Sequence, residues 1–185
     1  MRHFGLALVL FKISLSAAKA PQAGISILPH DRLALDAELK SLQVKIDEIG
    51  EHTLLPDIVI FHNAVRYALD DNMFYKPEDV PNAKHLLSLG HQRAEQLKAG
   101  KHPWTKETGL VIRGYKSSLD DSVIPYGLDI PPELSQKIHK NKRLDIWLHG
   151  RNNTLSEIRF LTERLKKTSQ FRPQNTIVLH PYGRF

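Results

Sequence analysis

The stretch Arg143–Glu157, "RLDIWLHGRNNTLSE", predicts a short strand, a polar loop and the start of a helix. Its apolar part, Leu144–Leu148, has the length and composition of a buried strand. Thr154 and Glu157 have the spacing of a capping box, in which Thr154 caps the helix and Glu157 reaches back to the cap. The helix is then expected to continue to about Lys167, because its apolar residues fall on one side.

Two further patterns place this stretch in a sheet. Thr176–Leu179, "TIVL", is apolar and β-branched, so strand, helix and strand form a βαβ unit whose two strands are expected to be parallel and buried. Upstream, Gly109–Ser117 and Ser122–Pro131 predict an antiparallel hairpin. Pro125 places the second hairpin strand near an edge or a bulge, since proline cannot donate to a ladder.

Residues 31–100 predict a helical segment. The first helix is expected from about Arg32 to Ile49, with Asp31 as its cap and Gly50 as its end. A second helix is expected to begin at Pro56, and a third covers about Pro81–Lys98. The predicted class is therefore α/β: a helical N-terminal segment (31–100) followed by an incomplete sheet (101–185), made of an antiparallel hairpin and then a parallel βαβ unit.

Composition excludes several kinds of site. The 185 residues carry a net charge of +6 and no cysteine, which excludes disulfides and thiolate metal sites. The ten histidines are scattered without an H-E-x-x-H motif, so no metal or other cofactor is predicted. No apolar run approaches the length of about 18 residues that spans a bilayer. The basic residues are also dispersed, so no nucleic-acid partner is predicted, although a basic nucleic-acid-binding protein stays a third hypothesis.

The N-terminus has the features of a targeting segment. Arg2 and His3 precede the apolar stretch Phe4–Phe11, and an A-x-A site lies at Ala18–Ala20. Residues 1–20 are therefore predicted to be a signal peptide, and residues 21–30 a linker. The protein is expected to be secreted or periplasmic. If residues 1–20 are instead a leading strand, a cytoplasmic location follows.

The order of these elements resembles the start of the α/β-hydrolase fold. The segments "LDIWLHGR", "TLSE" and "IVLHPYGR", with the helix "LLPDIVIFHNAVRYAL" and the predicted hairpin, resemble secreted bacterial serine hydrolases of the prolyl-oligopeptidase type over about residues 30–185. The resemblance implies that the loop His149–Asn152 forms part of an oxyanion hole, with Arg151 or Asn152 supplying a backbone N–H. His149 would hold the loop, Gly150 would let the backbone approach the substrate, and Asn152 stands where a glycine is expected.

The same resemblance implies catalytic residues that these 185 residues lack. No G-x-S-x-G motif is present, so the nucleophile and its acid and histidine partners are not assigned. The expected function is that of an N-terminal portion of a serine hydrolase, which cleaves peptide or ester bonds only with a complementary C-terminal half. His180 and Tyr182 are weaker candidates for a substrate pocket, and more simply they close a strand. The alternative is a non-catalytic helical interaction module.

Overall fold

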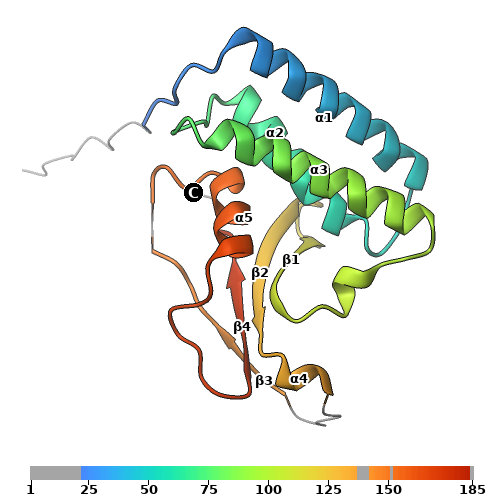
Figure 1. The fold of residues 1–185 in the computed structure, drawn as a ribbon, viewed down its shortest axis with the longest axis vertical. Coiled ribbons are helices and arrows are strands. Elements are labelled where there is room, and N and C mark those ends of the chain that lie inside the picture. The colour runs from blue at the N-terminus through green and yellow to red at the C-terminus, as the bar shows by residue number, and fades with distance from the viewer. Residues whose placement is uncertain (1–21, 137–141, 151, 184–185) are drawn as a thin grey trace, which may run out of the picture.

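The computed structural model describes residues 22–136, 142–150 and 152–183 (Figure 1). The predicted signal peptide and Arg151 therefore lie outside the described residues. The elements are α1 (Pro29–Ile49), α2 (Pro56–Asp70), α3 (Asp79–Lys98), a 3-10 turn η1 (Pro103–Thr105), β1 (Gly109–Lys116), β2 (Val123–Ile130), α4 (Glu133–Gln136), β3 (Arg143–Ile146), α5 (Glu157–Lys166) and β4 (Thr176–Pro181). The predicted mixed α/β class is confirmed.

The described strands form one mixed sheet in the order β1-β2-β4-β3. β1 and β2 pair antiparallel as the predicted hairpin, with Gly109 opposite Ile130 and Lys116 opposite Val123. β3 and β4 are parallel, as the βαβ pattern predicts, and β4 also pairs antiparallel with β2. β4 is the last of these strands along the chain, but it lies inside the sheet, where it joins the hairpin to the βαβ unit.

Two predictions about strand position are wrong. β3 was expected to be buried, but it lies at the sheet edge, and Leu144 and Ile146 are mostly exposed. Pro125 was expected to place its strand near an edge or a bulge, but that strand, β2, lies between β1 and β4. The proline is tolerated because its carbonyl accepts from the Tyr182 amide just past the last β2–β4 pair, where no further amide from β2 is required.

Two predicted helix caps are also wrong. The cap of α5 is Ser156, whose hydroxyl accepts from the Arg159 amide at 3.3 Å, so the helix begins later than a Thr154 cap requires. Asp31 lies inside the first turn of α1 and binds Lys84 of α3 at 2.6 Å. Both misassignments have one cause, because more than one capping-type side chain or start signal stands near each helix start. Gly50 ends α1 as predicted, with φ +65.

The helices cover one face of the sheet. α2 and α5 both contact β1 and β2, while α1 and α3 pack outside them (Figure 1). Glycines let the layers approach: a Cβ on Gly114 would meet the carbonyl oxygen of Pro56 at 2.2 Å, and one on Gly127 would meet Arg164. One cluster of buried residues runs from α1 through α2 and α3 to β1 and α5, so the helical segment and the sheet share a core.

A buried carboxylate joins α2 to β1. Asp57 is 1% exposed and accepts from Trp104 Nε1 at 2.9 Å, Arg113 Nε at 2.9 Å and the Gly114 amide at 2.7 Å. Arg93 of α3 lies beside it and donates to the carbonyls of Asp57 and Ile112, both at 3.0 Å. Because buried polar groups are costly unless paired, this Asp57 network fixes the angle between helices and sheet.

The segment 22–28, predicted as a linker, is extended and packed against the connection between α2 and α3. The Ile25 amide donates to the Phe74 carbonyl at 2.6 Å, and Ile25 and Ile27 pack on the core. A Cβ on Gly24 would lie 1.8 Å from the Asn72 carbonyl oxygen, so only glycine allows this approach. Within the described ranges, no helix is long and apolar enough to cross a membrane.

Candidate oxyanion loop

The loop that follows β3 lies at the carboxyl ends of the two parallel strands. It leads from Leu148 to Ser156, the cap of α5, and the end of β4 lies next to it. In open α/β sheets this is the end at which ligands bind. The structure thus brings two of the predicted residues, His149 and Tyr182, to one place from segments that are about thirty residues apart.

His149 ties the loop to the end of β4. The Gly183 amide donates to its Nε2 at 3.4 Å, so Nε2 is the acceptor and Nδ1 carries the proton. Nδ1 lies 3.0 Å from the Gly150 carbonyl and donates to it. Both ring nitrogens therefore make contacts with backbone groups.

Tyr182 holds the loop through a hydrogen bond and an aromatic contact. Its hydroxyl donates to the Leu155 carbonyl at 2.9 Å, and its ring lies 5.0 Å from that of Phe160 on α5. The His149 ring lies 6.1 Å from Phe160 and 6.4 Å from Tyr182, so three aromatic rings pack together. The hydroxyl is used to hold the loop, and no sequence pattern indicated that Phe160 takes part in this packing.

Asn152 shapes the loop through its side chain. Its Oδ1 accepts from both the amide and the hydroxyl of Thr154, each at 3.0 Å, which makes an Asx turn. Arg159 of α5 donates to the same Thr154 hydroxyl at 3.0 Å.

The loop leaves backbone donors available. Within the part of the chain that the structure describes, the amide of Gly150 donates to no other group, and Gly150 and Asn152 are both exposed. They precede the first turn of α5, whose unpaired amides add positive potential. Amides of this kind can bind an oxyanion if they are aimed at one point.

Gly150 is not required by the fold. A Cβ built on it meets nothing within 4 Å, and its φ is not in the left-handed region. We therefore expect Gly150→Ala to change the free energy of unfolding by less than about 0.5 kcal/mol. Chemical unfolding of the chain measures this. Gly24→Ala is the contrasting variant, and equal losses in the two would contradict the assignment of open space at Gly150.

His180 lies on the face of β4 that α5 covers, where burial and the charge of Arg164 lower its pKa. It is 5% exposed, and its Nε2 lies 3.0 Å from the Ser169 hydroxyl. The Ser169 amide donates to Asp129 of β2 at 2.9 Å, and Arg172 pairs with the same carboxylate at 3.1 Å. This closed cluster was not foreseen from the sequence, because its members come from three separate segments.

The His180 cluster predicts a pH dependence of stability. Burial lowers the pKa of His180 to about 4, and it also lowers the pKa of His62 on α2. An unfolded histidine has a pKa of about 6.5, so between these values the unfolded chain binds more protons and stability is lost as pH falls. We expect His180→Gln to flatten this slope in unfolding experiments between about pH 4.5 and 7. An unchanged slope in that variant, with a flattened slope in His62→Gln, would assign the effect to His62 alone.

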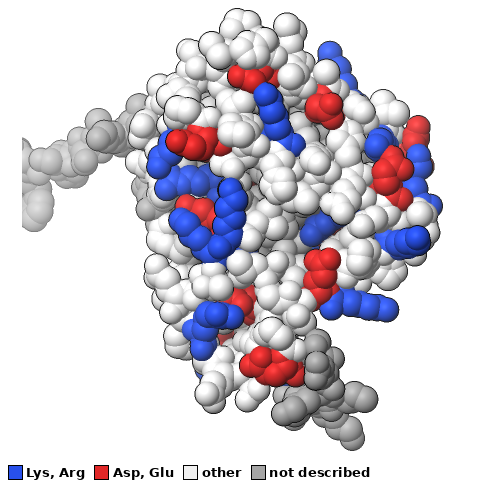
Figure 2. Space-filling model, in the orientation of Figure 1, with Lys and Arg blue, Asp and Glu red and all other residues white. Residues whose placement is uncertain are grey.

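The charged side chains elsewhere show no concentration of one sign on the face that Figure 2 presents. Several lysines are paired with acids, among them Lys45 with Glu95 and Lys98 with Glu48. Among the described residues, no three histidines, aspartates or glutamates are grouped as metal ligands. Comparison with known proteins returns no matching family model, no matching curated protein and no matching solved structure.

Proposed function

We propose that this chain is the oxyanion-loop portion of a serine hydrolase of the prolyl-oligopeptidase type, which cleaves peptide or ester bonds through an acyl-enzyme. The nucleophile is supplied from outside these 185 residues, since they hold no G-x-S-x-G motif. The chain alone is therefore inactive in acyl transfer. Its contribution is to present backbone N–H groups to the negative charge that develops on the substrate carbonyl oxygen.

One observation carries the proposal: the loop after β3 presents exposed residues at the carboxyl end of a strand whose outer edge pairs with no strand in the described ranges. An oxyanion hole of this type needs one N–H from this loop and one from the residue after the nucleophile. Both must reach the same oxygen, so the nucleophile strand has to lie beside β3. β4 occupies one side of β3, and the other side is the position that the proposal requires.

The supporting contacts give the loop the rigidity that this chemistry needs. Pre-aimed donors stabilise a transition state because they do not reorganise when charge develops. His149 and Tyr182 fix the loop to β4 and α5. Asn152 and Thr154 fix its last turn to Arg159. In this arrangement His149, Asn152 and Tyr182 are positioning residues, and the backbone amides of the loop act on the substrate.

The test begins with the nucleotide sequence beyond the codon for Phe185. A continuing frame, or one restored by a single frameshift, is expected to encode G-x-S-x-G, and the complete protein is expected to react with a fluorophosphonate probe. Asn152→Pro removes one amide donor and should lower the rate of p-nitrophenyl ester hydrolysis about 100-fold or more. Asn152→Ala is the matched control, because it keeps the amide and loses only the contacts to Thr154.

Two results would overturn the proposal. One is the absence of any nucleophile motif in the neighbouring sequence. The other is a complete protein in which Asn152→Pro and Asn152→Ala lower the rate equally, since the Asn152 amide would then have no part in stabilising the oxyanion. A loss of folding in Asn152→Pro is separated from a loss of catalysis by its thermal unfolding midpoint.

A further inference from the structure

The segment that joins α5 to β4, residues 167–175, is fastened to the sheet by polar side chains and is here called the α5–β4 connection. The Ser169 amide donates to Asp129 Oδ2 of β2 at 2.9 Å. Arg172 pairs with the same carboxylate through Nε at 3.1 Å and Nη2 at 3.3 Å. The Ser169 hydroxyl lies 3.0 Å from His180 Nε2 of β4. The connection is therefore held at two points, one on each of two neighbouring strands.

The contact with β4 contains a group that titrates between neutral and acid pH. His180 and Ser169 are each 5% exposed, so the imidazole and the hydroxyl meet away from bulk water. A neutral imidazole can donate a hydrogen bond to a hydroxyl or accept one from it, so this contact requires no charge. An imidazolium in the same place would be a buried charge, which is costly unless an opposite charge is paired with it.

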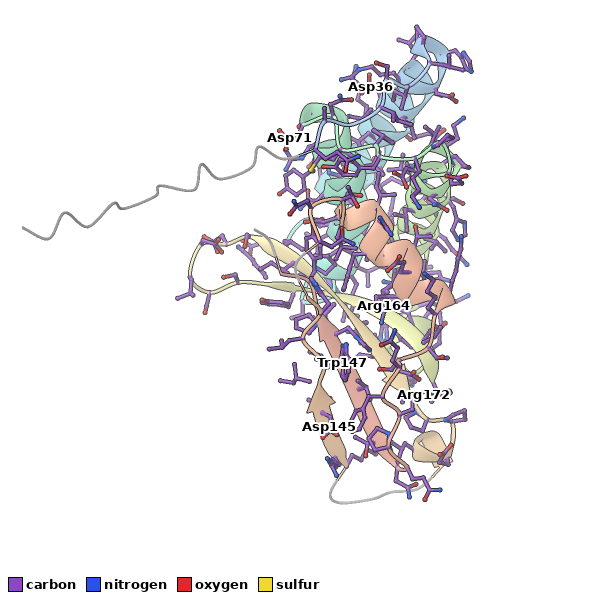
Figure 3. All side chains as sticks on the ribbon, turned by 90° about the vertical axis from the view of Figure 1, so that its left-hand side faces the viewer. Asp36, Asp71, Asp145, Trp147, Arg164 and Arg172 are labelled. Atoms are coloured by element: carbon purple, nitrogen blue, oxygen red, sulfur yellow. The ribbon has the colours of Figure 1, made fainter. Side chains whose placement is uncertain are left out.

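Three cationic groups face His180 from the elements around it. The stem of Arg164 on α5 lies against Gly127, which is the residue directly opposite His180 on β2. Arg172 comes from the connection, and Figure 3 shows it on the same side of the sheet as Arg164. His149, in the loop after β3, opposes a charge on His180 when it is itself protonated. A proton on His180 therefore adds positive charge where positive charge is already present.

Asp129 is the acid of the described residues that faces this cluster. It is 3% exposed, and both of its oxygens are engaged, Oδ2 by the Ser169 amide and Oδ1 by Arg172. Its charge is thus already shared and compensates only part of a further cation. Burial and the charge of Arg164 accordingly lower the pKa of His180 to about 4, although Asp129 acts in the opposite direction.

We propose that the α5–β4 connection opens locally in acid: it is closed while His180 is neutral and opens when His180 is protonated. Opening moves Ser169 and Arg172 away and lets water reach the imidazolium. It also separates Phe171 from Trp147, whose rings stack in the closed form with centroids 6.1 Å apart and planes 21° apart. The helices and the rest of the sheet stay folded. This goes beyond the proposed function and does not depend on it.

Hydrogen exchange of the full chain, followed by mass spectrometry, measures the opening. The open form binds the proton more tightly than the closed form, so closure is lost as pH falls below about 6.5. With a pKa of about 4 in the closed form, the opening equilibrium should rise about 10-fold or more between about pH 7 and pH 4.5. After correction for intrinsic exchange, protection of residues 167–175 should fall by that factor, while α2 should keep its protection.

Three variants identify the group responsible. Asp129 is a carboxylate that can also be protonated in acid, whereas the glutamine of His180→Gln does not titrate, so this variant should lose the pH dependence of the connection. His62→Gln is the matched control, because it removes another buried histidine, on α2, and should keep that dependence. Arg164→Met keeps an apolar stem on Gly127 and removes the cation, so its pH dependence should be smaller than that of the wild type.

Four results would overturn the proposal. The first is protection of residues 167–175 that is the same at both pH values in the wild type. The second is an equal loss of protection in α2, which would show global unfolding. The third is a pH dependence that survives in His180→Gln, which would assign the effect to Asp129. The fourth is an undiminished pH dependence in Arg164→Met, a variant that decides the matter even if His180→Gln does not fold.

Discussion

Replacing Asp57 with alanine is expected to lower the free energy of unfolding by about 3–5 kcal/mol. The substitution leaves three donors without their acceptor: the Trp104 indole, the Arg113 guanidinium and the Gly114 amide. It also leaves Arg93 close to Arg113 without the intervening negative charge, although burial already lowers the pKa of Arg93 to about 10. An uncompensated cation in the core costs more than the ion pair itself contributes.

Urea unfolding followed by circular dichroism measures this loss. Asp70→Ala is the matched control on the same helix, since Asp70 is exposed and makes one long contact of 3.6 Å with Arg66. We expect the control to change stability by less than about 0.5 kcal/mol. Equal effects in the two variants would mean that the Asp57 network does not hold α2 to β1.

Replacing Phe61 with alanine is the second large expected effect, a loss of about 3–5 kcal/mol. Phe61 is fully buried on α2, and a Cβ on Gly90 of α3 would lie 3.2 Å from it, so the two helices touch there. The ring also lies under the Arg93 guanidinium, 5.0 Å from its centroid. The substitution therefore removes apolar contacts and also the aromatic ring that packs against the buried Arg93 guanidinium.

The same unfolding experiment measures this variant, with Leu33→Ala on α1 as its control. Leu33 is 71% exposed, so its truncation is expected to cost less than about 0.5 kcal/mol. The double variant Asp57→Ala and Phe61→Ala should cost less than the sum of the single losses, because both act on Arg93. Strict additivity would argue against a shared network.

The helices and strands were predicted from local sequence patterns. The order of the strands in the sheet was not, because it depends on pairing between distant segments. Pro56 and Gly50 mark a helix start and a helix end, and the hairpin and the parallel βαβ unit were predicted from periodicity and turn residues. The position of β4 between β2 and β3 was not predictable in this way, because no local signal specifies the neighbours of a strand. The errors over Pro125 and over the burial of β3 both follow from that one missing fact.

The position of the candidate loop in the chain was predicted from the sequence, but the contacts that hold the loop were not. The loop from His149 to Asn152 could be located because a strand and a capped helix flank it. The support of that loop by Tyr182 depends on a hydrogen bond spanning 27 residues, which depends on the sheet order. For the same reason the contact of His180 with Ser169 was not predicted from the sequence.

The internal position of β4 has a consequence for synthesis. The ribosome releases the helices, the hairpin and β3 before β4, so β3 has no neighbour in the sheet until Thr176–Pro181 emerges. During that interval the apolar residues of β3 and the inner edge of β2 are both open to wrong pairing. Exposed strand edges of this kind attract chaperones and aggregate in crowded solution. The yield of folded protein therefore depends on a late step, the pairing of β4 with β2 and β3.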